Sequence, residues 1–178
     1  MVNEAVKNAG YYEGDFDYHR KREHVMITWQ CLSFAQLTTH QLYDALKLRA
    51  DIFVVEQDCV YPDLDDNDRA DDVYHLLGYQ DGKLIAYLRL LNAGLTYDNV
   101  SIGRVVTAQE TRGSGIGHQL LKQGLENAAR IWPNATIEIG AQEHLIGFYS
   151  QYGFKQTSDM YLEDGIPHVD MVLTQGDN

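Results

Sequence analysis

The sequence predicts a single α/β domain in which helices cover a mixed, mostly antiparallel sheet. Three observations lead to this fold class. Apolar stretches typical of strands group before and after one central strand–loop–helix unit. Two residues, Asp81-Gly82, separate two of these stretches, as in a tight β-hairpin. The length of 178 residues suits one domain, with or without a tail.

The first residues differ from the rest of the chain. Residues 1–25 are polar and aromatic and follow neither a helical nor a strand period, so we interpret them as a flexible N-terminal extension. The patterned domain then covers residues 26–178. It begins with an apolar stretch, MITWQCL at 26–32, which we expect to be a strand.

A helix is expected next, over residues 37–57. Thr38 can cap it, because Gln41 stands three residues further on in the arrangement of a capping box. Apolar residues then recur at helical spacing and form a stripe for the core. The stripe consists of Leu42, Leu46, Ala50 and Phe53. An acidic loop follows at 58–72, with Pro62 and seven aspartates.

Strands are expected on both sides of the Asp81-Gly82 turn, at 73–80 and 83–91. A further strand at 101–107 leads into a Gly-rich loop, and a helix is expected at 115–131. Pro133 marks the end of that helix.

The last part repeats the alternation of strand and helix. We expect a strand at 135–141, a short helix at 144–152 and a final hairpin across the turn 163–165. The two strands of this hairpin cover 153–162 and 167–174.

Composition limits the class of partner and the compartment. The formal net charge is −12, from 26 acidic and 14 basic side chains, which disfavours nucleic acid and anionic membranes and suits a cationic partner such as an amine. Acidic charge that only keeps the protein in solution is the simpler alternative. The chain shows no apolar run of membrane-spanning length, and two cysteines suggest no disulfide framework. We therefore expect a cytoplasmic protein.

The loop at 112–117, RGSGIG, joins a strand to a helix. Free N–H groups and the positive end of the helix dipole make such a junction a cradle for a phosphate or pyrophosphate. A P-loop would require Lys and then Ser or Thr after the last Gly, but His118 and Gln119 follow. A dinucleotide fingerprint would require Gly at position 118. A plain Gly-rich turn remains an alternative for the loop alone.

Two motifs together resemble a known family. Arg112-x-x-Gly115-x-Gly117 is similar to the acyl-CoA pyrophosphate loop of the GNAT superfamily of N-acetyltransferases. The segment 148–154, FYSQYGF, resembles the family's FYxxxGF segment and stands at the expected spacing. The resemblance covers residues 26–174 and is greatest to the small ElaA-type branch. It implies the GNAT fold, with a sheet of about seven strands.

The resemblance also implies roles for individual residues. The strand before the loop would hydrogen-bond the pantetheine arm, the loop amides would bind the pyrophosphate, and Tyr149 would protonate the leaving CoA thiolate. A phenol can donate to a thiolate of similar basicity at little cost. A core aromatic is the alternative role for Tyr149. The implied acetyl-CoA site comprises Val105, Val106, Thr107, Arg112, Gly113, Ser114, Gly115, Ile116, Gly117, Gln142, Phe148 and Tyr152. Gln142 stands where the family often has Asn, so its role is less directly implied.

The general base is not fixed by the sequence. An attacking amine must lose a proton, and the candidates are Glu56, His75 and Glu138. His75 lies among apolar residues, which favours a buried, hydrogen-bonded histidine over a base. Glu56 could belong to a surface turn.

Further polar residues lie near the expected site. Arg89 and Arg104 interrupt apolar strands, and each would need a carboxylate, either from Glu138 or from the substrate. His168 could line the acceptor cleft or cap the last hairpin. The acidic loop fails the requirements of a calcium-binding EF-hand at its sixth and twelfth positions, and no zinc spacing is present, so we expect no metal.

These observations favour an acyl-CoA-dependent N-acetyltransferase that moves an acetyl group to a primary amine in a ternary complex. A GNAT-like module that binds acyl-CoA without turnover is the alternative. A nucleotide enzyme is disfavoured by the missing Lys-Ser/Thr pair. The acceptor, a small amine or a protein amino group, and the oligomeric state, including a homodimer, are left open.

Overall fold

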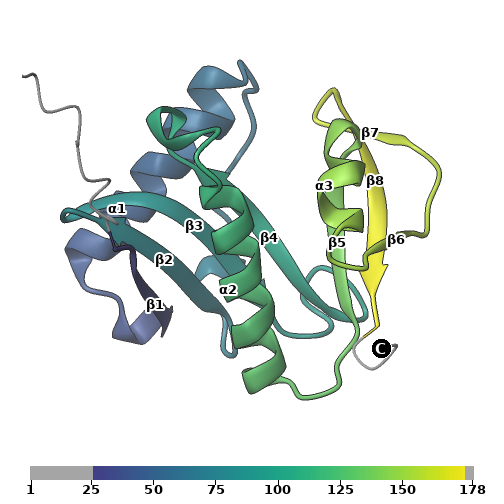
Figure 1. Cartoon of the computed structure of the whole chain (residues 1–178), viewed down its shortest axis with the longest axis horizontal. Helices are drawn as coiled ribbons and strands as arrows, with labels where there is room; N and C mark the ends of the chain where they lie inside the picture. Colours follow the sequence, from purple (N-terminus) through teal and green to yellow (C-terminus); the bar gives the residue numbers. More distant parts are fainter. Residues whose placement is uncertain (1–25, 175–178) are drawn as a thin grey trace, which may run out of the picture.

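The computed structural model describes residues 26–174 (Figure 1). The predicted N-terminal extension, residues 1–25, lies outside this part. Eight strands form one sheet in the order β1-β2-β3-β4-β5-β8-β6, with β7 paired to β8. All pairs are antiparallel except β4 with β5, which confirms the mixed, mostly antiparallel sheet. The strands are β1 (Thr28–Ser33), β2 (Tyr74–Gln80), β3 (Lys83–Leu91), β4 (Val100–Thr107), β5 (Ile137–Gln142), β6 (Lys155–Gln156), β7 (Tyr161–Glu163) and β8 (Ile166–Leu173).

The predicted first helix is present in two parts. α1 (Thr39–Arg49) is capped as expected: the Thr38 side chain accepts a hydrogen bond from the Gln41 N–H, and the Thr38 N–H donates to the Gln41 side chain. The helix then continues as a π-helical segment, Ala50–Glu56, instead of regular α-helix. Such widened turns are rare and often occur near functional sites. The remaining helices are α2 (Ile116–Ile131) and α3 (Ile146–Ser150).

α1 and α2 cover opposite faces of the sheet. Neighbouring residues of a strand point to opposite faces. The Arg49 guanidinium of α1 lies 5.8 Å from the ring centre of Tyr87, whereas α2 packs its Gly124 against Leu88, the next residue of β3. A Cβ at Gly124 would lie 2.7 Å from a Leu88 methyl carbon, so this close approach needs glycine. None of the helices between residues 26 and 174 has both the length and the apolar character needed to cross a lipid bilayer.

The two predicted hairpins are present. Asp81 and Gly82 both have positive φ, at 50° and 76°, as a tight two-residue turn requires. The last hairpin turns at Asp164-Gly165 in the same way. The strand expected at 153–162 is broken into β6 and β7, because Ser158 interrupts the ladder: its Oγ accepts from the N–H of Asp170 at 2.8 Å.

The sheet divides in its middle. β4 and β5 pair only at Val100–Ile137 and Ser101–Glu138, and no ladder pair follows. Beyond this point β5 continues with β8 as far as the Gln142–His168 pair. Figure 1 accordingly shows β5, β8 and α3 as an arm that diverges from β4. The edge of β4 that faces β5 is therefore unpaired over residues 102–107.

Candidate active site

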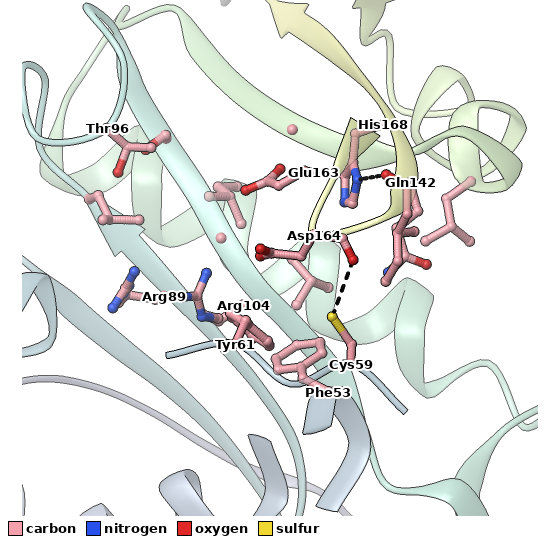
Figure 2. Close-up of a pocket in the computed structure, with 18 of the residues that line it drawn as sticks. Phe53, Cys59, Tyr61, Arg89, Thr96, Arg104, Gln142, Glu163, Asp164 and His168 are labelled. Carbon is pink, nitrogen blue, oxygen red and sulfur yellow. Dashed lines mark hydrogen bonds between the residues drawn. The ribbon is translucent and has the colours of Figure 1, made fainter. Parts of the chain in front are cut away.

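A cavity of about 240 Å³ lies where β4 and β5 diverge. Its walls come from distant parts of the chain: the segment after α1, the middle of β3 and β4, the end of β5, α3, and the β7–β8 turn. Figure 2 shows this cavity with its polar side chains pointing inward from several elements. The predicted residues Val105, Gln142, Tyr149 and His168 all line it, together with Arg89 and Arg104.

A β-bulge shapes the β4 wall. Arg89 pairs with Gly103 and Tyr87 with Val106, so Arg104 and Val105 together stand opposite the single residue between them on β3. Arg104 has a φ of 53°, which is uncommon for a residue with a side chain and carries strain. The bulge releases backbone N–H groups from the ladder beside the cavity. Such groups are suitable donors to a carbonyl oxygen.

The Gly-rich loop stands open at the start of α2. Gly113 and Gly115 have φ values of 75° and 85°, and a Cβ built on either meets no atom within 4 Å. Gly115 is the N-cap of α2, and no side chain caps the helix. The first-turn N–H groups of this 16-residue helix therefore have no side-chain cap and retain the positive end of the dipole. The geometry fits an anion such as a pyrophosphate.

Arg112, at the start of the loop, is held by an ion pair. Its guanidinium donates to both carboxylate oxygens of Glu56, at 2.5 Å and 3.0 Å. Glu56 was a candidate base, but it does not line the cavity, and both its oxygens are occupied by Arg112. The structure therefore places Glu56 beside the Gly-rich loop and outside the cavity that Tyr149 lines.

Tyr149 is a core aromatic that also lines the cavity. Its ring packs edge-on against Phe148 and Phe154, and the side chain is 6% exposed. Burial raises the pKa of its hydroxyl to about 12, and no residue between 26 and 174 shares a hydrogen bond with that hydroxyl. The group therefore stays protonated at neutral pH.

Phe148 and Tyr152 connect α3 to the start of α2. The Phe148 ring centre lies 4.9 Å from that of His118, and the Tyr152 hydroxyl lies 2.7 Å from His118 Nδ1. Both side chains lie outside the cavity lining. They brace the helix that carries the Gly-rich loop, and their contact with a cosubstrate stays a prediction.

Gln142 and His168 face each other across β5 and β8. The Gln142 amide donates to the Gln57 side chain at 3.4 Å. His168 Nδ1 lies 2.8 Å from the carbonyl oxygen of Ile166, which can only accept, so Nδ1 carries the proton of the neutral ring. Nε2 then keeps its lone pair, and no residue in the described part hydrogen-bonds it. His168 thus both braces the hairpin and lines the cleft, the two roles that the sequence suggested separately.

His75 lies elsewhere. It is 1% exposed and is absent from the cavity lining. Nε2 donates to the carbonyl oxygen of Asp68 at 2.8 Å, and Nδ1 accepts from the Tyr87 hydroxyl at 2.7 Å. Burial lowers its pKa. With both nitrogens occupied, His75 has the structural role that the sequence also allowed, and it offers no lone pair to a substrate.

The acidic loop pairs with buried arginines. The sequence offered Glu138 or a substrate as partners for Arg89 and Arg104, but Glu138 instead accepts from Asn99. Aspartates of the loop at 58–72 take that place, at N–O distances of 2.6–3.5 Å. No short sequence motif predicted this network, because its members come from α1, the acidic loop, β3 and β4. We call it the arginine–aspartate cluster: Arg49, Arg89 and Arg104 with Asp63, Asp65 and Asp68.

Comparison with known proteins places this geometry among acetyltransferases. The family model of an acetyltransferase (GNAT) domain matches residues 53–175. Protein ElaA of Escherichia coli (strain K12) is 42% identical over 146 residues, which cover 82% of this chain and 95% of ElaA.

Solved structures agree. An acyl-CoA N-acyltransferase from Pseudomonas aeruginosa is 44% identical, with a TM-score of 0.79 and coverage of 83% of this chain and 99% of that chain. An aminoglycoside 6'-N-acetyltransferase complexed with coenzyme A shares the fold at 14% identity, with a TM-score of 0.60 and coverage of 82% and 96%.

Proposed function

Because the chain belongs to the GNAT family of acetyltransferases, in its ElaA-like branch, we propose that it transfers an acetyl group from acetyl-CoA to a primary amine. Family and neighbours support acyl-CoA-dependent acyl transfer at the coarser level. The observation that carries the finer proposal is the junction of the open Gly-rich loop, the unpaired edge of β4 and a cavity lined by Tyr149.

The cosubstrate fits the unpaired features. The free edge of β4 at Val105, Val106 and Thr107 would hydrogen-bond the pantetheine amides as an added strand does. The amides from Arg112 to Gly117 would bind the pyrophosphate. This arrangement directs the thioester toward the bulge, where backbone N–H groups can polarise its carbonyl.

The chemistry then needs one base and one acid. The amine nitrogen attacks the thioester carbon, a C–N bond forms, and the C–S bond breaks. We assign the proton of the amine to His168 Nε2, directly or through a water, because this nitrogen has a lone pair and faces the cavity. Tyr149 donates its proton to the departing thiolate. Neither Glu56 nor His75 takes part in this assignment.

The test is the melting temperature with and without acetyl-CoA. Ligand at about a hundred times its dissociation constant should stabilise the chain by about 2.7 kcal/mol and raise the midpoint by several degrees. Ser114→Glu places a carboxylate on the exposed loop and should abolish the shift. Ala129→Glu adds the same charge at the exposed far end of α2 and should preserve it. A chain that shows no shift at any attainable concentration would refute the proposal.

A further inference from the structure

The cavity has two chemically different ends. In Figure 2, His168 and Gln142 lie on one side, and Arg89, Arg104 and Thr96 lie on the other. The first end carries the groups assigned to proton transfer. The second end is a wall of hydrogen-bond donors that the acetyl transfer itself does not use.

Arg104 is fixed at the donor end. Its Nε donates to Asp63 at 2.8 Å, Nη2 contacts the Asp63 carbonyl and Asp65, and the guanidinium lies over the Tyr61 ring at 5.5 Å. Its Nη1 has no acceptor among residues 26–174, and a quarter of the side chain is exposed. The strained backbone at the bulge turns this guanidinium toward the cavity, which makes it a rigid donor with one free edge.

Two buried donors beside it also lack partners. Arg89 gives both terminal nitrogens to Asp65 and Asp68, but its Nε has no acceptor in the described chain. Ser101 Oγ has no partner there either. Both residues are 3% exposed and line the cavity. Buried polar atoms are nearly always hydrogen-bonded, so these two atoms on one wall are donors available to an oxygen-bearing group in the cavity.

We propose that the amine acceptor carries a carboxylate at its far end, which binds to Arg104 and to the buried donors of Arg89 and Ser101. This assignment rests on the proposed acetyl transfer. Arg89 stands opposite Gly103 and Leu91 opposite Ser101, so the Arg89 and Ser101 donors lie before the bulge at which the transfer is proposed. The carboxylate is therefore several bonds from the amine, as in an ω-amino acid. It stays unchanged during the transfer.

One feature opposes this assignment and defines its competitor. Glu163 and Asp164 line the cavity and make no ion pair within residues 26–174, while the arginines of the cluster are matched by three aspartates. A diamine could place its second ammonium near these acids. The charge of the distal group therefore decides between the two acceptors.

The experiment compares three acceptors of equal length: 6-aminohexanoate, hexylamine and 1,6-diaminohexane. Release of free CoA thiol measures kcat/KM, and melting temperature in the presence of CoA measures acceptor binding without turnover. We expect 6-aminohexanoate to exceed hexylamine by about tenfold in kcat/KM, since hydrogen bonds to charged groups are the strong ones. The diamine should be poorer still. Equal rates for the first two, or preference for the diamine, would overturn the proposal.

Single substitutions test which residues are responsible for the preference for 6-aminohexanoate. Arg104→Gln should remove the preference for 6-aminohexanoate, measured as the ratio of its kcat/KM to that of hexylamine within the same variant. Ser101→Ala should weaken the same preference while the melting temperature stays the same or rises, because the lost hydroxyl has no partner to leave behind. Arg69→Gln, in the exposed pair with Asp66, is the matched control and should change nothing. A preference that survives both Arg104→Gln and Ser101→Ala would contradict the assignment.

The two proposals fail in different ways. If hexylamine and 6-aminohexanoate are acetylated equally, acetyl transfer stands and the carboxylate assignment falls. If no amine is acetylated but 6-aminohexanoate still raises the melting temperature more than hexylamine does, the donor wall binds a carboxylate and the proposed transfer falls. If neither rate nor melting temperature separates the acceptors, the carboxylate assignment is refuted.

Discussion

The polar side chains in and near the cavity differ in whether other residues of the chain already hydrogen-bond them. Outside the cavity lining, His75 and Asp63 have partners at both polar side-chain atoms and Asp68 accepts from two arginines, and these hydrogen bonds maintain the structure. Tyr149 and His168 each keep one group that no residue in the described part of the chain engages. A tyrosine hydroxyl and an imidazole nitrogen that both remain available to a substrate at one cavity are a functional indication.

Tyr149→Phe tests whether the chain is an enzyme or a module that only binds acyl-CoA. The substitution removes one hydroxyl that makes no hydrogen bond within residues 26–174 and keeps the buried ring, so the melting temperature and CoA affinity should not change. If Tyr149 is the acid, kcat should fall by about a hundredfold or more, as for loss of general acid catalysis.

Steady-state kinetics and calorimetric titration of CoA provide the two readings for Tyr149→Phe. Tyr43→Phe makes the same chemical change at a side chain that is 69% exposed on α1, and it should leave both readings unchanged. An unaltered kcat in Tyr149→Phe would remove this residue from the mechanism and support the non-catalytic alternative.

Among the elements, the segment from α1 to the acidic loop contacts both the Gly-rich loop and the cavity. Its π-helical part ends at Glu56, whose carboxylate accepts hydrogen bonds from Arg112 at the start of the Gly-rich loop. Farther on, Cys59 Sγ lies 3.6 Å from the carbonyl oxygen of Asp164, which ties the segment to the β7–β8 turn across the cavity (Figure 2). The segment thus connects the two halves of the divided sheet.

Glu56→Gln should tighten CoA binding. The carboxylate of Glu56 neutralises Arg112 and adds a negative charge close to the place proposed for the pyrophosphate. Removing that charge frees the guanidinium and lowers the repulsion, so we expect the dissociation constant of CoA to fall by about threefold to tenfold at low salt and less at high salt. The stability should change by no more than about 1 kcal/mol, since the pair is partly exposed.

Titration calorimetry at two salt concentrations measures the effect of Glu56→Gln. Asp51→Asn is the control, because Asp51 lies in the same π-helical segment but pairs with Lys47 at the surface. Weaker CoA binding in Glu56→Gln would show the opposite role, in which Glu56 orients Arg112 for the ligand.

Features of the fold that depend on neighbouring residues were predictable from the sequence. The Thr38 cap, the Asp81-Gly82 turn and the Gly-rich start of α2 were predictable, because each is encoded by residues a few positions apart. The break between β6 and β7 was not, since it depends on a contact between Ser158 and Asp170 across the sheet.

The same limit applies to the site. Tyr149 was identified by a local motif, whereas the pairing of Arg104 with Asp63 joins positions 41 residues apart and depends on how the acidic loop folds. The pairing of Glu56 with Arg112 is equally non-local. Sequence therefore predicted the open Gly-rich loop at the start of α2 but not the polar architecture of the cavity.

For the whole molecule, acidification has two opposing effects on stability. The net charge of −12 means that protons relieve repulsion among carboxylates and so stabilise the compact state. His75 acts in the other direction, because burial lowers its pKa in the folded chain. Asp65 does the same at lower pH: burial alone would raise its pKa, but the hydrogen bond and charge of Arg89, with the charge of Arg104, hold it below 3.8.

The sign follows from proton binding. Below the ordinary histidine pKa of about 6.5, an unfolded chain protonates His75 while the folded chain resists it, so the unfolded state binds more protons. Stability from His75 is present above about pH 6.5 and is lost as the pH falls toward the folded pKa. Stability from Asp65 is present above about pH 4 and is lost only as the pH falls further. The window between about pH 7 and 5 therefore isolates His75.

His75→Gln should flatten the pH dependence of the melting temperature in that window. Glutamine can donate to the Asp68 carbonyl and accept from the Tyr87 hydroxyl, so the fold should survive with some loss of stability at pH 7. Between pH 7 and 5, the melting temperature of the unmodified chain should fall relative to that of this variant. The relief of repulsion among carboxylates is common to both and does not affect the difference. His40→Gln removes an exposed histidine of α1 and should keep the slope of the unmodified chain. If His75→Gln and the unmodified chain show equal slopes, His75 already takes up its proton in the folded state, and the buried neutral histidine described above would be refuted.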